Sequence, residues 1–261
     1  MTLAVEETTE SVHFGLVELD LLSAHAGVPW PFPLRVPSFG RLAGEREILL
    51  AVAGETLYRR GLAGDSGPVG MAAEVVAALR EHRGTIDLVL TGERVIGVVA
   101  LVYRESVLLC RQVLDDDPAG TVGVRRVHDA ALAAELLKQV PEVAAPVSMP
   151  ITLPAGAVTA ATRWPGEPGE QELRDLFRDH GGDPAALDSL VGLVVPVHGL
   201  GQLGATRRGV RAGSELSWLD GPRGRVAVRA ATDGWVSVNP LRRTGVRSAL
   251  EELATIARSS R

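Results

Sequence analysis

The residues between positions 214 and 240 constrain the fold of this chain more than any other segment. They read SELSWLDGPRGRVAVRAATDGWVSVNP, in which apolar and polar residues alternate apart from two interruptions, at Gly-Pro-Arg-Gly and at Asp-Gly. Alternation with a period of two is typical of half-buried strands, and short Gly-rich interruptions are typical of hairpin turns. The segment therefore predicts three consecutive antiparallel strands.

The register of the second turn follows from the same alternation. In a two-residue loop, Arg229 would face Val238, and both faces of the hairpin would mix polar with apolar residues. In a three-residue loop at 232–234, Val228 would face Val238 and one face would be entirely apolar. Because a slip by one residue turns every side chain to the other face, the apolar pattern selects the register. We predict the three-residue loop, with Gly234 in the left-handed conformation of a G1 bulge.

The other face of these strands carries Trp235, Arg225 and Arg229, and the length of the first turn decides whether Trp218 joins them. Two interpretations are open. Either helices cover this face and the Trp and Arg side chains stack within the molecule, or part of the face contacts a partner protein, because Trp and Arg are frequent at the energetic centres of interfaces.

The whole chain predicts an α+β fold, because strands are grouped together and helices are grouped together. The N-terminal half (11–141) has the order strand, helices, antiparallel meander, helix, and the C-terminal half (145–261) has the same order. We interpret this as a hidden duplication: quasi-two-fold half-domains within a single domain (1–261), with a central antiparallel β-sheet flanked by two helical bundles. The expected strands are 11–19, 85–93, 94–104, 106–113, 120–128, 147–154 and those from 193 to 240; the expected helices are 18–27, 45–61, 69–84, 129–140, 170–181, 183–191 and 245–259.

Individual residues mark several boundaries of these elements. The segment 28–40 holds four prolines and cannot form a regular helix or central strand, so we expect an extended cover over the core. Asp129 and Asp183 each precede an apolar helical stripe and predict N-caps, and Pro184 suits the first helical position.

The composition excludes several classes of protein. The chain has 261 residues and carries 27 basic and 32 acidic side chains, so its net charge of −5 does not favour nucleic-acid binding. Its one cysteine, Cys110, lies in an apolar strand-like run, which predicts a buried thiol and no disulfide within the chain. No signal peptide or long apolar span is present, so we expect a cytoplasmic protein without membrane insertion.

One glycine-rich segment raises the possibility of nucleotide binding. Residues 199–204 read GLGQLG and match the dinucleotide pattern G-x-G-x-x-G after a strand-like run. A true fingerprint must then open a helix, here near Ala205, whereas further glycines follow and no apolar helical stripe does. A glycine-rich strand or bulge is therefore favoured, and a nucleotide-binding enzyme is kept as the alternative.

No other segment offers a set of catalytic or metal-binding residues. The six histidines lack the spacing of zinc ligands, and the acidic run at 114–118 predicts a solvated turn. No nucleophile, base and orienting group stand in a recognisable pattern. We expect no cofactor, no metal and no enzymatic activity.

Two segments, taken in order, resemble the EspG family of cytosolic chaperones of type VII (ESX) secretion in actinobacteria. They are FGLVELDLLSAHAGVPWPFPL (14–34), followed by a helical pair, and WLDGPRGRVAVRAATDGWVSVNP (218–240), followed by an amphipathic helix. Within the second, Asp220, Gly224-Arg225-Val226, Asp233-Gly234-Trp235 and Pro240 are the most specific residues. An arginine-rich composition with a single lysine, Lys138, agrees with the resemblance.

The resemblance implies a non-enzymatic chaperone that shields the apolar tip of a PE/PPE heterodimer, or of another helical secretion substrate, and keeps it soluble. The family's contact surface involves the C-terminal helical bundle and the neighbouring sheet. A generic protein-interaction module remains open, as does a homodimer formed edge to edge by uncovered strands. The residues that we expect to contact the partner are Leu173, Leu176, Phe177, Leu187, Leu190, Gln202 and Trp218, although leucines at helical spacing are also typical of a core.

Overall fold

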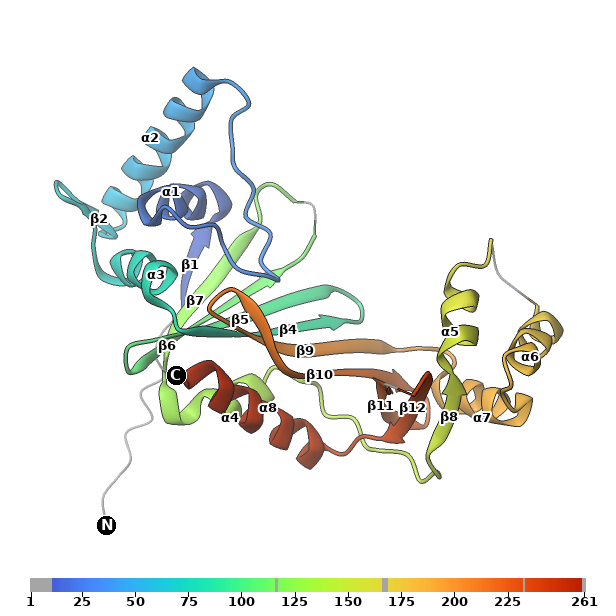
Figure 1. Cartoon of the computed structure of the whole chain (residues 1–261). Coiled ribbons are helices and arrows are strands. Elements are labelled where there is room, and N and C mark those ends of the chain that lie inside the picture. Colours follow the sequence, from blue (N-terminus) through green and yellow to red (C-terminus); the bar gives the residue numbers. More distant parts are fainter. Residues whose placement is uncertain (1–10, 116, 166–168, 232, 260–261) are drawn as a thin grey trace, which may run out of the picture.

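The computed structural model describes residues 11–259 except 116, 166–168 and 232. Ten strands form one antiparallel sheet: β1 (Val12–Gly15), β4 (Gly84–Thr91), β5 (Val95–Tyr103), β6 (Ser106–Val113), β7 (Thr121–His128), β8 (Ile151–Pro154), β9 (Gly199–Arg207), β10 (Val210–Gly221), β11 (Gly224–Ala230) and β12 (Trp235–Pro240). Their order in the sheet is β1-β7-β6-β5-β4-β9-β10-β11-β12-β8 (Figure 1). A separate two-stranded ribbon comprises β2 (Ala63–Gly64) and β3 (Gly67–Pro68).

The two halves of the chain contribute to the sheet in mirrored order. The first strands of the two meanders, β4 and β9, pair at the centre, with Leu88 opposite Leu203. The first strand of each half, β1 or β8, lies at an edge and pairs with the last strand of its own meander. Two-fold related halves would produce this topology, and the duplication itself stays a prediction.

The register predicted for the last hairpin is confirmed. Val228 pairs with Val238, and Gly234 has a φ of 87°, in the left-handed region that the predicted bulge requires. Thr232, the first residue of the predicted loop, lies outside the described residues. At the preceding turn Gly221 pairs with Gly224, which leaves a two-residue loop and settles the position of the tryptophan on β10 described below.

The helices divide into three groups around the sheet (Figure 1). They are α1 (Leu16–Ala26), α2 (Ala43–Arg59), α3 (Gly70–Glu81), α4 (Leu132–Leu137), α5 (Ala155–Thr162), α6 (Glu170–Asp179), α7 (Pro184–Val194) and α8 (Arg243–Arg258). Helices α4 and α8 pack together on one face of the central strands, which we call the closed face. Helices α1–α3 and α5–α7 form two clusters at opposite ends of the other face. Between these clusters, β4, β9 and β10 form the open face, on which Leu200 and Gln202 are exposed.

The closed face contains the largest core. The apolar stripe of α8 predicted from its spacing is buried there, with Val246 and Leu250 fully inaccessible to solvent. It packs with inward side chains of the central strands, among them Leu203 and Leu216. The sheet and α8 therefore hold the two halves of the chain together through one continuous apolar layer.

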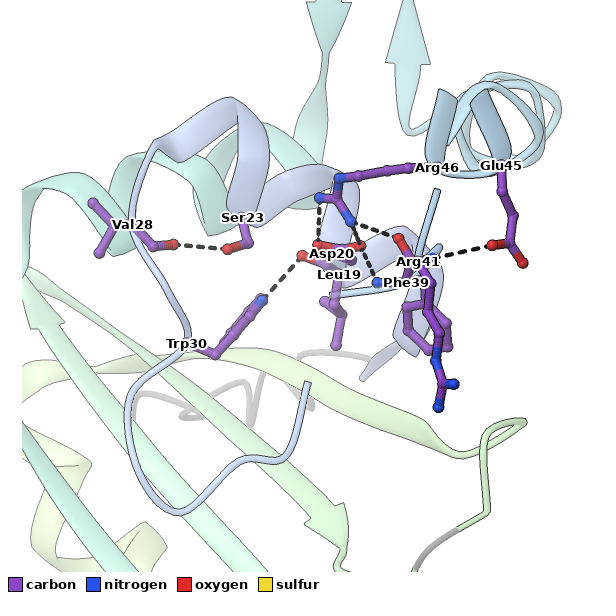
Figure 2. A network of polar contacts seen from close by, with 9 residues as sticks. All are labelled: Leu19, Asp20, Ser23, Val28, Trp30, Phe39, Arg41, Glu45 and Arg46. Atoms are coloured by element: carbon purple, nitrogen blue, oxygen red, sulfur yellow. Dashed lines mark hydrogen bonds and ion pairs between the residues drawn. The ribbon is translucent and has the colours of Figure 1, made fainter. Parts of the chain in front are cut away.

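The proline-rich segment 28–40 covers the N-terminal cluster as predicted, and polar contacts fasten it to α1 (Figure 2). The Trp30 indole donates a hydrogen bond of 3.0 Å to the Leu19 carbonyl. The buried Asp20 carboxylate accepts hydrogen bonds from the Phe39 amide at 2.9 Å and from the Arg46 guanidinium at 2.6 and 2.9 Å. The extended segment is thus held to α1 by the Leu19 carbonyl and by the buried Asp20 carboxylate.

Several predicted boundaries differ from the structure. Asp129 is not an N-cap: its carboxylate pairs with Arg258 at 2.7 Å, and the ring of His128 caps the 3-10 turn that precedes α4 by accepting from the Ala130 amide at 3.2 Å. A short 3-10 turn, η1 (Asp129–Ala131), precedes α4, which is shorter than the predicted helix. The predicted strands 11–19 and 147–154 are also shorter, because α1 begins at Leu16 and β8 begins at Ile151. Helix α5 and the β2–β3 ribbon were not predicted.

The predicted character of the lone cysteine is confirmed. Cys110 is free and fully buried on β6, where it packs within the N-terminal core. Burial raises the pKa of its thiol to about 12, so the thiolate is not populated near neutral pH.

Candidate partner-binding surface

The C-terminal cluster forms because its helices have clear start signals and amphipathic faces. Asp183 caps α7 by accepting from the Ala185 amide at 2.9 Å, and Pro184 occupies the first helical position, as predicted. Gly169 precedes α6, and its amide donates to the Glu172 carboxylate at 2.7 Å. The two helices pack on each other, and α7 also packs on β8, which places the apolar core of this cluster over the last strands of the sheet.

The five predicted residues of these helices divide between core and surface. Phe177 and Leu187 are buried in the core of the C-terminal cluster. Leu173 and Leu190 are half-buried and pack against that core, and Leu176 is half-buried as well. The cluster therefore uses most of its helical leucines for its own cohesion.

The exposed apolar surface lies just beyond α7 instead. Val191, Val195, Val197 and Leu200, which we call the exposed apolar run, are between 43% and 55% exposed. Val191 lies in the last turn of α7, Val195 and Val197 lie on the link between α7 and β9, and Leu200 lies at the start of β9. The sequence signal for this surface is the apolar run LVVPVHGL. A proline interrupts the run, and its apolar residues do not recur with the period of a helix or a half-buried strand.

The open face continues this surface onto the sheet. Leu200 pairs with Leu219, which packs against the core of the C-terminal cluster, so Leu200 faces the same side of the sheet as α5–α7. Gln202 lies two residues further along β9 and therefore shares that side. It pairs with Val89 and Ser217 on the neighbouring strands and is exposed, as a contact residue would need to be.

A polar network lies at the centre of the open face. The Arg211 guanidinium donates to the Asp87 carboxylate and, at 2.6 Å, to the Glu215 carboxylate. A Cβ atom on Gly204 would overlap the Arg211 guanidinium, so a glycine at this position makes room for the network. The amide of Gln202 approaches the Glu215 carboxylate at 3.4 Å and extends the network toward the exposed apolar run.

Asp87 is the most constrained member of this network. Its side chain is buried, and its Oδ2 atom has no hydrogen-bond partner among the described residues. Desolvation by burial raises the pKa of this carboxyl, and the hydrogen bond from Arg211 opposes that rise. The Arg211 side chain is 40% exposed and thus offers a charged group to solvent at the middle of the surface.

Trp218 lies on the closed face and not on this surface. It pairs with Ala227, shares a side with Arg225, and is only 1% exposed. The Arg225 guanidinium lies 5.1 Å from its ring and forms two hydrogen bonds, of 2.6 and 2.7 Å, with the Asp220 carboxylate. The interpretation in which Trp and Arg stack within the molecule therefore holds for this pair, whereas Trp235 on β12 is partly exposed.

The glycine-rich segment 199–204 is a strand. Ala205 continues β9, so the helix that a dinucleotide site requires does not begin there. Gly201 has a packing role, because a Cβ atom there would overlap the Trp218 ring. Contact with the Trp218 ring accounts for Gly201, and room for the Arg211 guanidinium accounts for Gly204, so neither glycine requires a bound nucleotide.

Comparison with known proteins gives a family match and a similar fold. The model of the EspG family matches residues 16–252. The chain belongs to the EspG family. None of the curated proteins compared with it matches. Among solved structures, the Mycobacterium tuberculosis type VII secretion system chaperone EspG5, in complex with a PE25-PPE41 dimer, is similar, with a TM-score of 0.63 and 14% sequence identity. The match covers 94% of this chain and 95% of that one, so the similarity of fold extends over both.

Among the described residues, no three His, Cys, Asp or Glu side chains come together as potential metal ligands. None of the helices within the described part of the chain is long and apolar enough to cross a bilayer.

A groove of about 700 Å³ separates α7 from the segment leading into β8; Met149, Pro150, Asp183, Asp188 and Arg223 are among its lining residues.

Proposed function

We propose that this protein is a non-enzymatic cytoplasmic chaperone of type VII secretion that binds a PE/PPE-like heterodimer, or a similar helical secretion substrate, and keeps it soluble. The observation that carries the proposal is the match to the EspG family over nearly the whole described chain. The fold similarity to a chaperone that was solved with a PE25-PPE41 dimer supports it.

The proposed contact surface combines the exposed apolar run, the open face and the exposed parts of α6 and α7. Leu173, Leu176, Leu190 and Gln202 are the members of the predicted set whose side chains reach solvent. An apolar loop tip on the substrate would bury Val195 and Leu200, which are otherwise exposed at a cost in hydration. In the complex, these side chains and the apolar tip of the substrate cover one another. The apolar surface through which the free substrate would aggregate is then no longer exposed.

The polar network supplies orientation within this surface. Charged groups amid apolar contacts contribute specificity and register more than affinity. Arg211 retains exposed donor groups while Asp87 and Glu215 hold it in place, so it can bind a carbonyl or carboxylate oxygen on the substrate. Phe177, Leu187 and Trp218 would act by supporting the shape of the surface from beneath.

The competing functions receive less support. A nucleotide-binding enzyme would need a helix at Ala205, where β9 continues. A generic interaction module would share the fold and the exposed apolar run but would bind a substrate unrelated to PE/PPE proteins. The identity of the bound substrate separates this second reading from the proposed one.

Co-expression with a PE/PPE heterodimer from the same genome tests the proposal. We expect a stable complex that copurifies at a near one-to-one ratio and loses most of its affinity in Val195→Asp. Val69→Asp is the matched control, because Val69 is also an exposed valine but precedes α3 in the other cluster. If no PE/PPE pair binds, the proposed substrate is refuted. If Val195→Asp and Val69→Asp lose affinity equally, the proposed surface is refuted.

A further inference from the structure

A small polar pocket lies at the β1 end of the sheet, on the closed face and outside the surface just described. The strands β1, β7 and β6 form this end of the sheet in that order (Figure 1). Leu109 on β6 belongs to the core beneath α4 and α8, and the pocket begins beside it. The volume of the pocket is about 260 Å³, and most of its lining residues have polar side chains: Ser11, His13, Arg111, Thr121, Arg125 and Gln139.

Gly123 on β7 is the floor of this pocket, and polar side chains surround it in two directions. Across the sheet, Gly123 pairs with His13 on β1 and with Arg111 on β6, and directly paired residues share one face. Along β7, Thr121 and Arg125 lie two residues away on either side, which places them on the same face. Four polar side chains therefore stand around a position that has no side chain of its own.

The polar groups from β1 converge over this floor. A Cβ atom on Gly123 would lie 3.1 Å from the Ser11 Oγ atom and 3.4 Å from the His13 Nε2 atom, so even an alanine would crowd both groups. A glycine inside a strand is typical of a place where a ligand or another chain segment approaches the backbone closely. The hydroxyl and the imidazole can each donate a hydrogen bond to an acceptor above Gly123.

The charge around this pocket is positive, although the whole chain has a net charge of −5. Arg111 is exposed, and its guanidinium has no hydrogen-bond or ion-pair partner among the described residues. Arg125 pairs with the Glu135 carboxylate at 2.6 Å, and Lys138 pairs with the same carboxylate at 2.6 Å. Three cations minus one carboxylate leave a net charge of +2 in this cluster. The pocket therefore favours an anion, and Arg111 is available to bind it.

We propose that this pocket binds a small phosphate monoester, with the phosphate above Gly123. A phosphate has three oxygens that accept hydrogen bonds in different directions, which suits donors placed around one point. The planar guanidinium of Arg111 can bind two of these oxygens, and His13 and Ser11 can donate to the third. A carboxylate has two oxygens in one plane and would leave part of this ring of donors unused.

The size and the apolar wall of the pocket limit the organic part of the ligand. Leu109 and Val113 line one side of the pocket and would contact the carbon atoms of the ester. A volume of about 260 Å³ lies below the range typical of sites for drug-sized ligands, so the ester group is short. Because the pocket lies on the closed face, the bound ligand leaves the proposed substrate surface accessible. The inference does not depend on the proposed function.

Titration calorimetry of the full chain tests the class of ligand. Phenyl phosphate should bind saturably and more tightly than inorganic phosphate, because only the ester covers the apolar wall. Benzoate presents the same ring with a carboxylate and should bind about tenfold more weakly than phenyl phosphate, because it makes fewer charged hydrogen bonds. Absence of saturable phenyl phosphate binding, or benzoate of equal affinity, would overturn the proposal. Inorganic phosphate that binds as tightly as phenyl phosphate would overturn the assignment to an ester.

Two arginine variants test the location of the site. Arg111→Met should raise the dissociation constant of phenyl phosphate about tenfold, because the variant loses hydrogen bonds between charged groups. Arg229→Met is the matched control and should bind like wild type. Arg229 is also an exposed arginine whose side chain has no partner within the described part of the chain, but it lies on β11 in the other half of the sheet. Equal losses in both variants would overturn the assignment to the pocket, and unchanged melting temperatures would exclude misfolding as the cause of a loss.

Discussion

The two faces of β9 and β10 use the same kinds of residue for different purposes. On the closed face, the Asp220–Arg225 pair is buried beside Trp218, and the two side chains form two short hydrogen bonds. On the open face, the Asp87–Arg211 pair leaves one carboxylate oxygen unpartnered and the guanidinium half exposed. The Asp87–Arg211 pair spans β9 at Gly204, whereas the Asp220–Arg225 pair joins two neighbouring strands, and only the second pair is buried at both side chains.

The difference shows how one sheet separates stability from binding. A buried ion pair is costly to break, because the charge that remains is not solvated by water. A half-exposed pair can exchange partners, because water or a ligand can replace a lost hydrogen bond. Substitutions on the closed face should therefore cause the largest changes in the free energy of unfolding, and substitutions on the open face should change binding with smaller effects on that free energy.

The largest expected effect is at Arg225. Arg225→Met leaves the Asp220 carboxylate buried without its partner, and we expect a loss of about 3–5 kcal/mol in the free energy of unfolding. Denaturant titration measures it. The double variant Asp220→Asn, Arg225→Met should recover part of this loss, since no buried charge then remains. A loss below about 1 kcal/mol in the single variant would show that the closed face is not sealed.

The next effect concerns the glycine beneath Trp218. Gly201→Ala places a methyl group where the Trp218 ring lies, and overpacking of this kind costs about 1–3 kcal/mol. The matched control is Gly192→Ala on α7, where a Cβ atom meets no neighbour and alanine should stabilise the helix by up to about 1 kcal/mol. Thermal unfolding of both variants should shift in opposite directions. Shifts of equal sign would contradict the packing role of Gly201.

A smaller and pH-dependent effect is expected at Arg211. Arg211→Met removes the partner of Asp87, and because water can enter where the half-exposed guanidinium was, we expect a loss of about 1–2 kcal/mol at neutral pH. Burial already raises the pKa of Asp87 in the folded protein. Ionised Asp87 therefore destabilises the folded protein at pH values above that raised pKa. This destabilisation is lost as the pH falls through the raised pKa and the carboxyl becomes protonated.

Denaturation across a range of pH tests this sign. The stability difference between Arg211→Met and wild type should narrow on acidification, since Asp87 becomes protonated first in the variant. With Asp87→Asn in the same background, the difference should no longer depend on pH in this range. A difference that widens on acidification would mean that another group controls it.

The smallest effect on stability is expected at the exposed apolar run. Leu200→Thr should change the free energy of unfolding by no more than about 0.5 kcal/mol, because the side chain is already 43% exposed. Leu203→Thr is the matched control on the closed face of the same strand, where the side chain is fully buried and a loss of about 3 kcal/mol is expected. Comparable losses in the two variants would show that β9 has no open face.

Much of the fold followed from period and turn chemistry. The two meanders were predictable because strands with one apolar side alternate visibly, and the last hairpin could be assigned to the residue because only one register leaves an apolar face. Helix α5 was missed because AGAVTAAT lacks an apolar stripe of helical spacing. The cap before α4 was misassigned to Asp129, since sequence could not show that Arg258 from the far end of the chain engages it.

The candidate surface was less predictable than the fold. Leucines at helical spacing on α6 and α7 were correctly expected on one side of each helix, yet spacing does not reveal whether a partner or the same molecule covers that side. Phe177 and Leu187 lie in the core, and the exposed apolar run lies on and beside the connection between α7 and β9, whose sequence has no helical or strand period. Asp87 and Arg211 are separated by more than a hundred residues, so no local pattern could have joined them.

By itself, then, the sequence determined most of the strands and helices, the register of the last hairpin and the family, because these depend on interactions between near neighbours and on ordered motifs. Only the tertiary structure decided which face of the sheet is closed, which tryptophan is core, and which glycines make room for a side chain from another strand. Those outcomes depend on the pairing of β4 with β9 and the placement of α8, which join distant segments. Burial is a property of the assembled layers, and no local pattern encodes it.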